Sequence, residues 1–381
     1  MGDAAMVPDR ARRVTVYDVA ARAGVSIATV SFAFRRPDEV RAATREAVLT
    51  AARELGYAPS GSARGLVSRR TGSLGLHSFD MLIERPQDEE APEGAAVDAD
   101  LDLSADTLPW AALGDDVHSD PLAYPLYVDE IQRGFELEAR RRGHNVLLSS
   151  GGRSTADVAD TAGRVDGLAV FPSIVARESL AHITQTIPVV LFSSPIASAD
   201  GYHRVLVDNV QGMQDLVAHL VQDHQITDLA FVGGPAAADY AERFAGMQSA
   251  MRRFGLTPAS EPLDSSLLGD TRPLARVREL AIAGALPRAL ICASDQLALF
   301  TFEILRSVGS RVPEDVVVTG FDGVLASRLS VPRLTTVRQP MEAMGRVAAQ
   351  LLANAAGAPP QMPRTLRLGT QLRIGQSCGC P

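Results

Sequence analysis

The most regular pattern of apolar and polar positions lies near the start of the chain. Four apolar residues recur there at the i, i+3, i+4, i+7 spacing of a short amphipathic helix: Val16, Val19, Ala20 and Ala23. Thr15 precedes them as a good N-cap, and Gly24 follows where a left-handed residue is easiest to accommodate. The pattern predicts a helix that ends at a glycine-containing turn.

Two further helices are predicted after this turn. Ser26 is placed to cap the second helix, which points Val30 and Phe34 inward and ends at Pro37-Asp38. The third helix has one apolar face, made of Val48, Ala51, Ala52 and Leu55. This arrangement indicates a helix-turn-helix DNA reader, and the alternative is a small three-helix bundle without a nucleic-acid role.

The residues of this region resemble the N-terminal pattern of the lac repressor (LacI/GalR) family. The matching segments are Val14-Thr15, Tyr17-Asp18-Val19-Ala20, Ala23-Gly24-Val25-Ser26, Thr29-Val30-Ser31, Thr44-Arg45, Leu55-Gly56-Tyr57 and Pro59. The resemblance continues to the C-terminal RIGQSCGC, interrupted only by an insert at about residues 79–122. It implies a DNA-binding domain at 12–59 and favours the DNA reader over the simple bundle.

The resemblance also implies a set of DNA contacts. Six polar residues look like phosphate contacts that set position: Thr15, Ser26, Thr29, Ser31, Arg35 and Thr44. Many family members carry Arg where this chain has Phe32, and Phe cannot form the paired hydrogen bonds by which Arg reads guanine. Base readout therefore depends on Ile27, Ala28 and Phe32 against thymine methyls, and on DNA shape. A single short reading helix predicts a homodimer on a palindromic operator.

Residues 60–70 are predicted to form the hinge of this family, which orders as a short helix on specific DNA. Leu66 lies where the family inserts a leucine into the minor groove, as an apolar wedge that kinks the duplex. Gly61 and Gly65 weaken a helix, which suits a segment that orders only on DNA. The alternative is a plain flexible linker.

From Thr71 onward, apolar strands alternate with helices of 10–15 residues. The predicted strands lie at 73–77, 145–150, 165–171, 187–192, 229–234, 289–295 and 316–323, and the helices at 128–142, 177–186, 211–224, 238–254 and 296–308. This alternation predicts an α/β protein with doubly wound parallel sheets behind an all-α head. A length of 381 residues agrees with two or three domains.

Family resemblance divides this core into two lobes like those of periplasmic binding proteins. It implies an N-subdomain at about 71–207 plus 340–368, and a C-subdomain at about 208–339 plus 369–381. Ligands of parallel sheets bind beyond the carboxyl ends of the strands, so a small effector is expected between the lobes. The implied effector contacts are Tyr127, Ser193, Arg243, Ser294, Asp295, Phe321 and Asp322.

An Arg with carboxylates and a stacking aromatic suits a polyhydroxylated ligand such as a sugar. Structural alternatives stay open: Asp295 as the cap of the following helix, Asp322 as turn chemistry before Gly323, and Arg243 paired with solvent-side acids. Ser193 replaces the Asp of many sugar-binding members, which leaves nucleosides and other small metabolites open.

Charge is distributed unevenly along the chain, whose net charge is −8. Residues 1–70 hold 12 Arg against 7 acidic residues, which gives +5, as expected for a DNA-binding head. Residues 80–120 hold one Arg against 13 acidic residues, which gives −12. This insert is predicted to be a solvated loop, with a flap over the effector cleft or a protein-binding segment as the alternatives.

Other chemistry receives little support. Only three cysteines occur, and Cys378-x-Cys380 finds no suitably spaced histidine to complete a zinc set, so neither a metal nor a cofactor is predicted. No phosphate-binding loop or nucleophile elbow indicates an enzyme. Without a membrane span or signal peptide, a cytoplasmic protein is expected. A transport binding protein shares the core fold but would lack the DNA-binding head.

Overall fold

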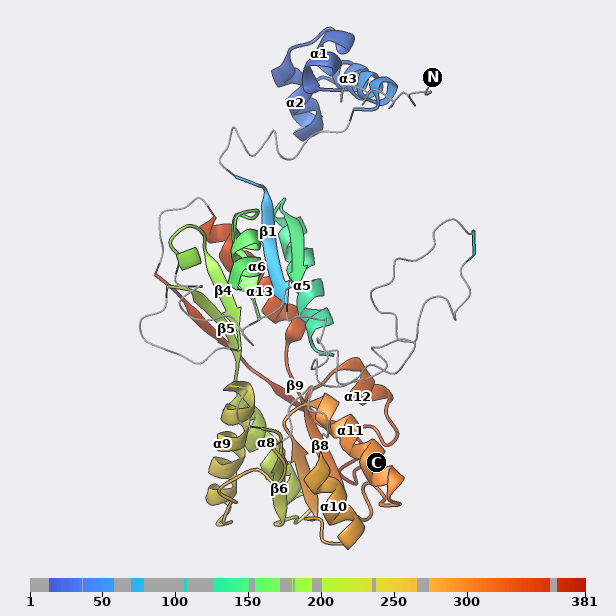
Figure 1. Ribbon diagram of the computed structural model, residues 1–381, viewed down its shortest axis with the longest axis vertical. Coiled ribbons are helices and arrows are strands. Elements are labelled where there is room, and N and C mark those ends of the chain that lie inside the picture. Colours follow the sequence, from blue (N-terminus) through green and yellow to red (C-terminus); the bar gives the residue numbers. More distant parts are fainter. Residues whose placement is uncertain are drawn as a thin grey trace, which may run out of the picture. The chain divides into compact units, whose positions relative to one another are not determined.

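The computed structural model describes residues 14–35, 37–57, 70–78, 106–107, 126–150, 155–171, 180, 182–193, 201–234, 238–265, 274–356 and 362–381. The chain divides into two compact units, Met1–Thr71 and Gly72–Pro381 (Figure 1). Apart from Arg70 and residues 106–107, the predicted hinge and insert lie outside the described residues.

The first unit contains the predicted three helices, which are thereby confirmed. They are α1 (Val16–Ala23), α2 (Ile27–Arg35) and α3 (Ala42–Leu55), with a 3-10 turn η1 (Pro37–Glu39) between the last two. Val19, Val30 and Val48 meet in the centre of the unit with no exposed surface. Gly24 ends α1 at φ +66°, a left-handed conformation that glycine adopts without strain.

The second unit begins with a six-stranded parallel sheet in the order β10-β5-β4-β3-β1-β2. Its strands are β1 (Ser73–Ser78), β2 (Asn145–Ser150), β3 (Leu168–Val170), β4 (Val189–Phe192), β5 (His203–Val207) and β10 (Thr365–Leu368). The helices of this lobe are α5 (Val128–Arg141), α6 (Thr155–Ala162) and α13 (Met341–Ala355). β3, β4 and β5 are buried along their whole length, because helices cover a parallel sheet on both faces.

The second lobe has a five-stranded sheet in the order β11-β9-β8-β7-β6, parallel except for the edge strand β11, which runs antiparallel to β9. Its strands are β6 (Leu229–Val232), β7 (Ala289–Cys292), β8 (Val317–Asp322), β9 (Thr335–Arg338) and β11 (Gln371–Arg373). Its helices are α8 (Asn209–Gln222), α9 (Ala238–Arg253), α10 (Ala275–Ala283), α11 (Asp295–Ser307) and α12 (Leu325–Leu329). The predicted α/β alternation is confirmed.

The chain crosses between the two sheets three times. It leaves β5 for α8 at Asp208, returns from β9 to α13 at 339–340, and leaves β10 for β11 at 369–370. The sequence pattern placed the start of the second half near Val207. It did not predict the strands β5, β9, β10 and β11 or the helices α6, α10, α12 and α13. These strands are short, with three to five residues each, and the edge strands β10 and β11 alternate between exposed and half-buried residues, so none of the four gives a long apolar run.

Two glycines set the position of α5 against α13. A Cβ on Gly134 would lie 2.0 Å from the carbonyl oxygen of Glu342, and one on Gly345 would lie 1.9 Å from that of Ile131. The helix backbones therefore approach as closely as they can at this crossing. Since Tyr127 directly precedes α5, this contact also fixes where that tyrosine enters the core.

Candidate functional site

The face of α2 that the sequence assigned to base readout is exposed. Ile27 and Phe32 are 41% and 45% exposed, and Ala28 is exposed beside them. Exposed large apolar side chains on a small helical domain indicate a contact surface, because burial within the unit was available to Val30 and Ala33 on the opposite face.

Three of the predicted phosphate contacts take part in helix capping. Ser26 Oγ accepts the backbone N–H of Thr29 at 3.1 Å and lies 2.9 Å from its hydroxyl, so both residues lie at the N-terminus of α2. The backbone and hydroxyl of Thr15 donate to the Asp18 carboxylate at 2.8 and 2.7 Å. Ser31 and Thr44 are half-buried, whereas the side chain of Arg35 and all of Leu66 lie outside the described part of the chain.

In the core, Arg243 of α9 is the centre of a buried polar cluster. Its side chain is 3% exposed, its Nε donates to Asn209 Oδ1 at 2.9 Å, and its Nη1 donates to the carbonyl oxygen of Ala293 at 2.6 Å. Nη1 also lies 3.3 Å from Asp322 Oδ1. The guanidinium stacks 3.8 Å above the ring of Phe321. The open alternative of a solvent-side ion pair for Arg243 is therefore wrong.

Asp322 ends β8 beside this guanidinium in an unusual backbone conformation. Its φ is +121°, which few non-glycine residues adopt, so surrounding contacts hold it in place. Gln339, at a crossing between the lobes, donates from Nε2 to Asp322 Oδ1 at 2.5 Å. Burial raises the pKa of Asp322, although the positive charge of Arg243 opposes the rise.

Tyr127 belongs to the lobe with the six-stranded sheet and lies next to this cluster. Burial, together with the negative charges of Asp239 and Asp322, raises the pKa of Tyr127 well above its ordinary value, so its hydroxyl stays protonated. Its ring meets Phe171 edge to face at 6.0 Å. The neighbouring Leu126 N–H donates to Oε1 of Gln296 in α11 at 3.4 Å. Side chains and backbone from both lobes thus meet beside Asp322.

Two predicted serines lie at the ends of strands. Ser294 follows β7 and caps α11, accepting the N–H of Leu297 at 3.2 Å. Ser193 follows β4 with a left-handed φ of +52° and is half-buried. Both stand at the carboxyl edge of their sheets, where ligands of parallel sheets bind.

Asp295 does not belong with these contacts. Its side chain has no exposed surface; Oδ2 accepts the N–H of Val324 at 2.8 Å, and the hydroxyl of Thr336 hydrogen-bonds Oδ1. The cap of α11 is Ser294, so the alternative of an Asp295 cap is wrong as well. Asp295 instead connects α11 to β9 and to the loop that leads into α12.

Two further members of the cluster were not predicted. Asn209 is 1% exposed and joins Arg243 to Asp239 and Glu242, to which its Nδ2 donates at 3.1 and 3.0 Å. Tyr240 lies 5.8 Å from the guanidinium of Arg243. Asn209 could have been predicted from its position directly after the crossing at Asp208, because residues at a crossing lie close to both lobes.

A head with an exposed reading helix and a two-lobed core with a buried polar cluster define the class of DNA-binding regulators controlled through a binding core. Residues 15–60 match the profile of the bacterial regulatory proteins of the lacI family, and residues 217–378 match the periplasmic binding protein-like domain. A transcriptional regulator of Mycolicibacterium smegmatis is 30% identical over 98% of this chain and 99% of its own length. The chain belongs to the LacI family and is a DNA-binding transcriptional regulator.

Other relatives agree. The regulator CelR of Thermobifida fusca is 28% identical over 97% of this chain and 99% of its own. A solved complex of CelR with cellobiose is similar at a TM-score of 0.62 and 27% identity, covering 96% of this chain and all of that one. The lac repressor dimer bound to operator and an anti-inducer shares the fold, with a TM-score of 0.71 at 21% identity. Within the described residues, no helix is both long and apolar enough to span a membrane.

Proposed function

We propose that this regulator binds a palindromic operator as a homodimer and that a small polyhydroxylated metabolite, held between its two lobes, controls that binding. The observation that supports the effector site best is Arg243, buried, stacked on Phe321 and paired with Asp322. A guanidinium and a carboxylate offer fixed donors and acceptors for hydroxyl groups, and an aromatic face packs against the carbon face of a sugar ring.

The effector contacts we propose are Tyr127, Arg243, Phe321 and Asp322, with Ser193 and Ser294 at the strand ends. Tyr127 comes from one lobe and the other three from the opposite lobe, so a bound ligand would contact both. A ligand that prefers one arrangement of the lobes shifts the population toward it, with a coupling to DNA of about 1–3 kcal/mol. CelR binds cellobiose, which makes carbohydrates the first class to test.

Exposed apolar side chains on the second lobe support the homodimer. Leu325 and Leu329 of α12 are 61% and 72% exposed, and Val331 just beyond is 93% exposed. We propose that a second copy covers this surface, because contiguous exposed apolar residues mark interaction sites. A Leu329→Asp variant should elute as a monomer in size-exclusion chromatography with light scattering, whereas Ile282→Asp on α10 serves as the matched exposed control.

In the head, we propose base readout by Ile27, Ala28 and Phe32, phosphate contacts by the six polar residues named above, and a minor-groove wedge by Leu66. Leu66→Ala should remove most of the preference for operator over random DNA while non-specific binding remains. Operator affinity measured by fluorescence anisotropy at several salt concentrations tests this. An unchanged preference would contradict the wedge.

The effector proposal is tested with the full chain and a panel of cellobiose, other disaccharides, monosaccharides and nucleosides. Operator binding of the wild type should change with one class of probe, and Arg243→Ala should lose that change. Tyr127→Phe removes only a hydroxyl and keeps the fold testable, and Arg253→Ala supplies an exposed arginine control on the same helix. A full response in both Arg243→Ala and Tyr127→Phe would overturn the site, and no response of the wild type to any probe would overturn the effector class.

A further inference from the structure

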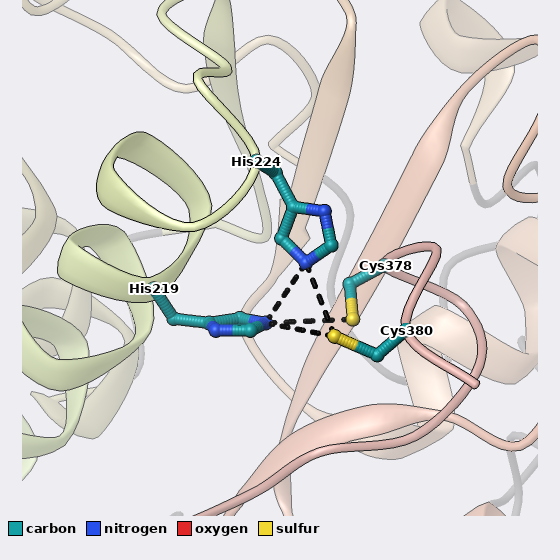
Figure 2. A group of neighbouring side chains, drawn as sticks. All are labelled: His219, His224, Cys378 and Cys380. Carbon is teal, nitrogen blue, oxygen red and sulfur yellow. Dashed lines mark hydrogen bonds between the residues drawn. The ribbon is translucent and has the colours of Figure 1, made fainter.

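Two histidines and two cysteines come together at the far end of α8 from Asn209. His219 lies in the last turn of α8 and His224 just beyond it, while Cys378 and Cys380 belong to the C-terminal segment (Figure 2). One potential ligand atom from each residue lies within 4.8 Å of all the others. His219 and Cys378 are buried and the other two are half-buried, so the group is sheltered from solvent.

Four of the six distances within this group, which we name the His₂Cys₂ cluster, are close to those of a tetrahedral zinc site, and all six are within 4.8 Å. His219 Nε2 lies 3.2 Å from His224 Nε2 and 3.5 Å from Cys378 Sγ. Cys380 Sγ lies 3.3 Å from His224 Nε2 and 3.9 Å from His219 Nε2. Around a tetrahedral zinc ion, ordinary bond lengths place two imidazole nitrogens about 3.3 Å apart and a nitrogen and a sulfur about 3.6 Å apart.

Hydrogen bonding alone accounts poorly for this convergence. Nδ1 of His219 lies 2.7 Å from the Asp223 carboxylate, which can only accept, so Nδ1 carries a proton. In the neutral ring, Nε2 then presents one lone pair to the cluster. The other three side chains all contact that one nitrogen (Figure 2). The Cys378 thiol can instead donate to the carbonyl oxygen of Gly375 at 3.4 Å, but the one lone pair still faces both His224 and Cys380, whereas a cation at the centre would be bound by all four atoms.

The surroundings of the ligands are those of a metal site. Asp223 orients His219, in the way that carboxylates orient zinc-bound imidazoles. The hydroxyl of Thr335 lies 3.1 Å from Cys378 Sγ. Thr335 Oγ1 already accepts the N–H of Gly375 at 2.9 Å, so its own hydrogen is available to the sulfur. A zinc-bound cysteine sulfur can accept such a hydrogen bond from its surroundings.

We propose that His219, His224, Cys378 and Cys380 bind one Zn²⁺ in a closed, structural site. Two thiolates and two imidazoles in a tetrahedral set suit zinc, and four protein ligands leave no open position for catalysis. Binding converts two thiols to thiolates and releases their two protons, while the neutral imidazoles coordinate through Nε2. The site ties the end of α8 to the C-terminal segment, both of which follow a crossing from the other lobe.

The test uses the full chain, purified in reducing buffer without chelator or a histidine tag, with zinc measured by plasma mass spectrometry. We expect about one zinc per chain. Cys380→Ser and His224→Gln should both lose it, while Cys292→Ser, which changes the buried cysteine outside the cluster, should retain it. Asp223→Asn, at an exposed residue, should weaken zinc affinity about 10–100-fold without abolishing binding.

A spectroscopic arm keeps the test decisive if a variant folds poorly. Co²⁺ added to the metal-free wild type should give the strong visible bands of tetrahedral cobalt and a near-ultraviolet sulfur-to-cobalt band, and Zn²⁺ should displace it. Three outcomes would overturn the proposal. They are a wild type that holds no zinc and gives no tetrahedral cobalt spectrum, zinc retained in both Cys380→Ser and His224→Gln, or a Cys378–Cys380 disulfide found by mass spectrometry in the freshly purified protein.

Discussion

Helix α8 has a cluster of polar side chains at each end, and the two clusters differ in charge. At its N-terminus, Asn209 joins the buried ion pair of Arg243 and Asp322. At its C-terminus, the His₂Cys₂ cluster contains two imidazoles and two thiols, all of which are uncharged as neutral rings and as S–H groups. Fourteen residues separate the ends by about 21 Å of helix.

The difference in charge between the two clusters indicates which kind of ligand each could bind. The N-terminal cluster contains both a positive and a negative charge, so the Arg243–Asp322 pair can remain buried without a ligand. A polar ligand would replace some of the hydrogen bonds within this cluster. A buried ion pair contributes little more to stability than apolar side chains of the same volume would. Stability alone therefore explains this pair poorly, whereas ligand binding explains it well. The C-terminal cluster contains acceptors and thiols but no positive centre, and a cation would complete it.

The largest expected effect comes from removing the charge that balances Asp322. Arg243→Ala would leave a buried carboxylate without its cation, and we expect the free energy of unfolding to fall by about 3–5 kcal/mol. Urea unfolding followed by circular dichroism measures this. Adding Asp322→Asn to Arg243→Ala should recover part of the loss, and Arg253→Ala should change stability by no more than about 0.5 kcal/mol. A small effect of Arg243→Ala would mean that solvent reaches the pair.

Chelation is expected to give the next largest effect, at the opposite end of α8. With free zinc at about 100 to 1,000 times its dissociation constant, the metal would contribute about 2.7–4.1 kcal/mol to the stability of the core. A strong chelator should therefore shift the urea midpoint of the wild type downward. The same chelator should leave Cys380→Ser unchanged, because that variant has no site to lose. If the wild type had the same urea midpoint with and without chelator, zinc would make no contribution to the stability of the core.

Much of the fold could be predicted from local sequence, and the polar cluster around Arg243 could be predicted in part. The head is specified by side chains within a few residues of each other, such as Thr15 with Asp18 and Ser26 with Thr29, so its helices could be predicted closely. Arg243 and Asp322 were predicted through family resemblance. Their mutual contact and their burial were not, because both depend on how α9 packs against β8.

The His₂Cys₂ cluster shows what residue spacing in the sequence cannot reveal. Cys378 and Cys380 are separated from His219 by 159 and 161 positions, far beyond the spacings that indicate a zinc motif. Only the third crossing between the lobes returns the C-terminus to the end of α8. A short sequence motif also does not reveal that both carboxylate oxygens of Asp295 are hydrogen-bonded inside the core.

A buried carboxyl group near the N-terminal cluster predicts a pH dependence of the free energy of unfolding. Burial, followed by the nearby charge of Asp322, raises the pKa of Asp295. Its folded form therefore binds a proton more tightly than its unfolded form. This contribution to stability is complete below about pH 4 and is lost as pH rises through the folded pKa, with a slope of at most about 1.4 kcal/mol per pH unit.

The free energy of unfolding should thus fall as pH rises from about 5 to 8, and Asp295→Asn should reduce that slope. Asp315 is the matched control, since Arg311 lowers its pKa by hydrogen bonding. The stabilisation by Asp315 is present above the unfolded pKa and is lost only in acid, so Asp315→Asn should leave the slope above pH 5 unchanged. An equal slope in Asp295→Asn and the wild type would mean that Asp295 is ionised in the folded core at neutral pH.

The smallest expected effect is the coupling between the two ends of α8. Changes separated by more than about 10 Å and without shared partners usually add to within about 0.3–0.5 kcal/mol. Asn209 and His219 share no hydrogen-bond partner among the described residues, so the losses from Arg243→Ala and Cys380→Ser should sum in the double variant. The same urea experiment on the four proteins of this cycle measures the difference. A coupling above about 1 kcal/mol would show that α8 transmits strain along its length and that metal binding at one end influences the effector site at the other.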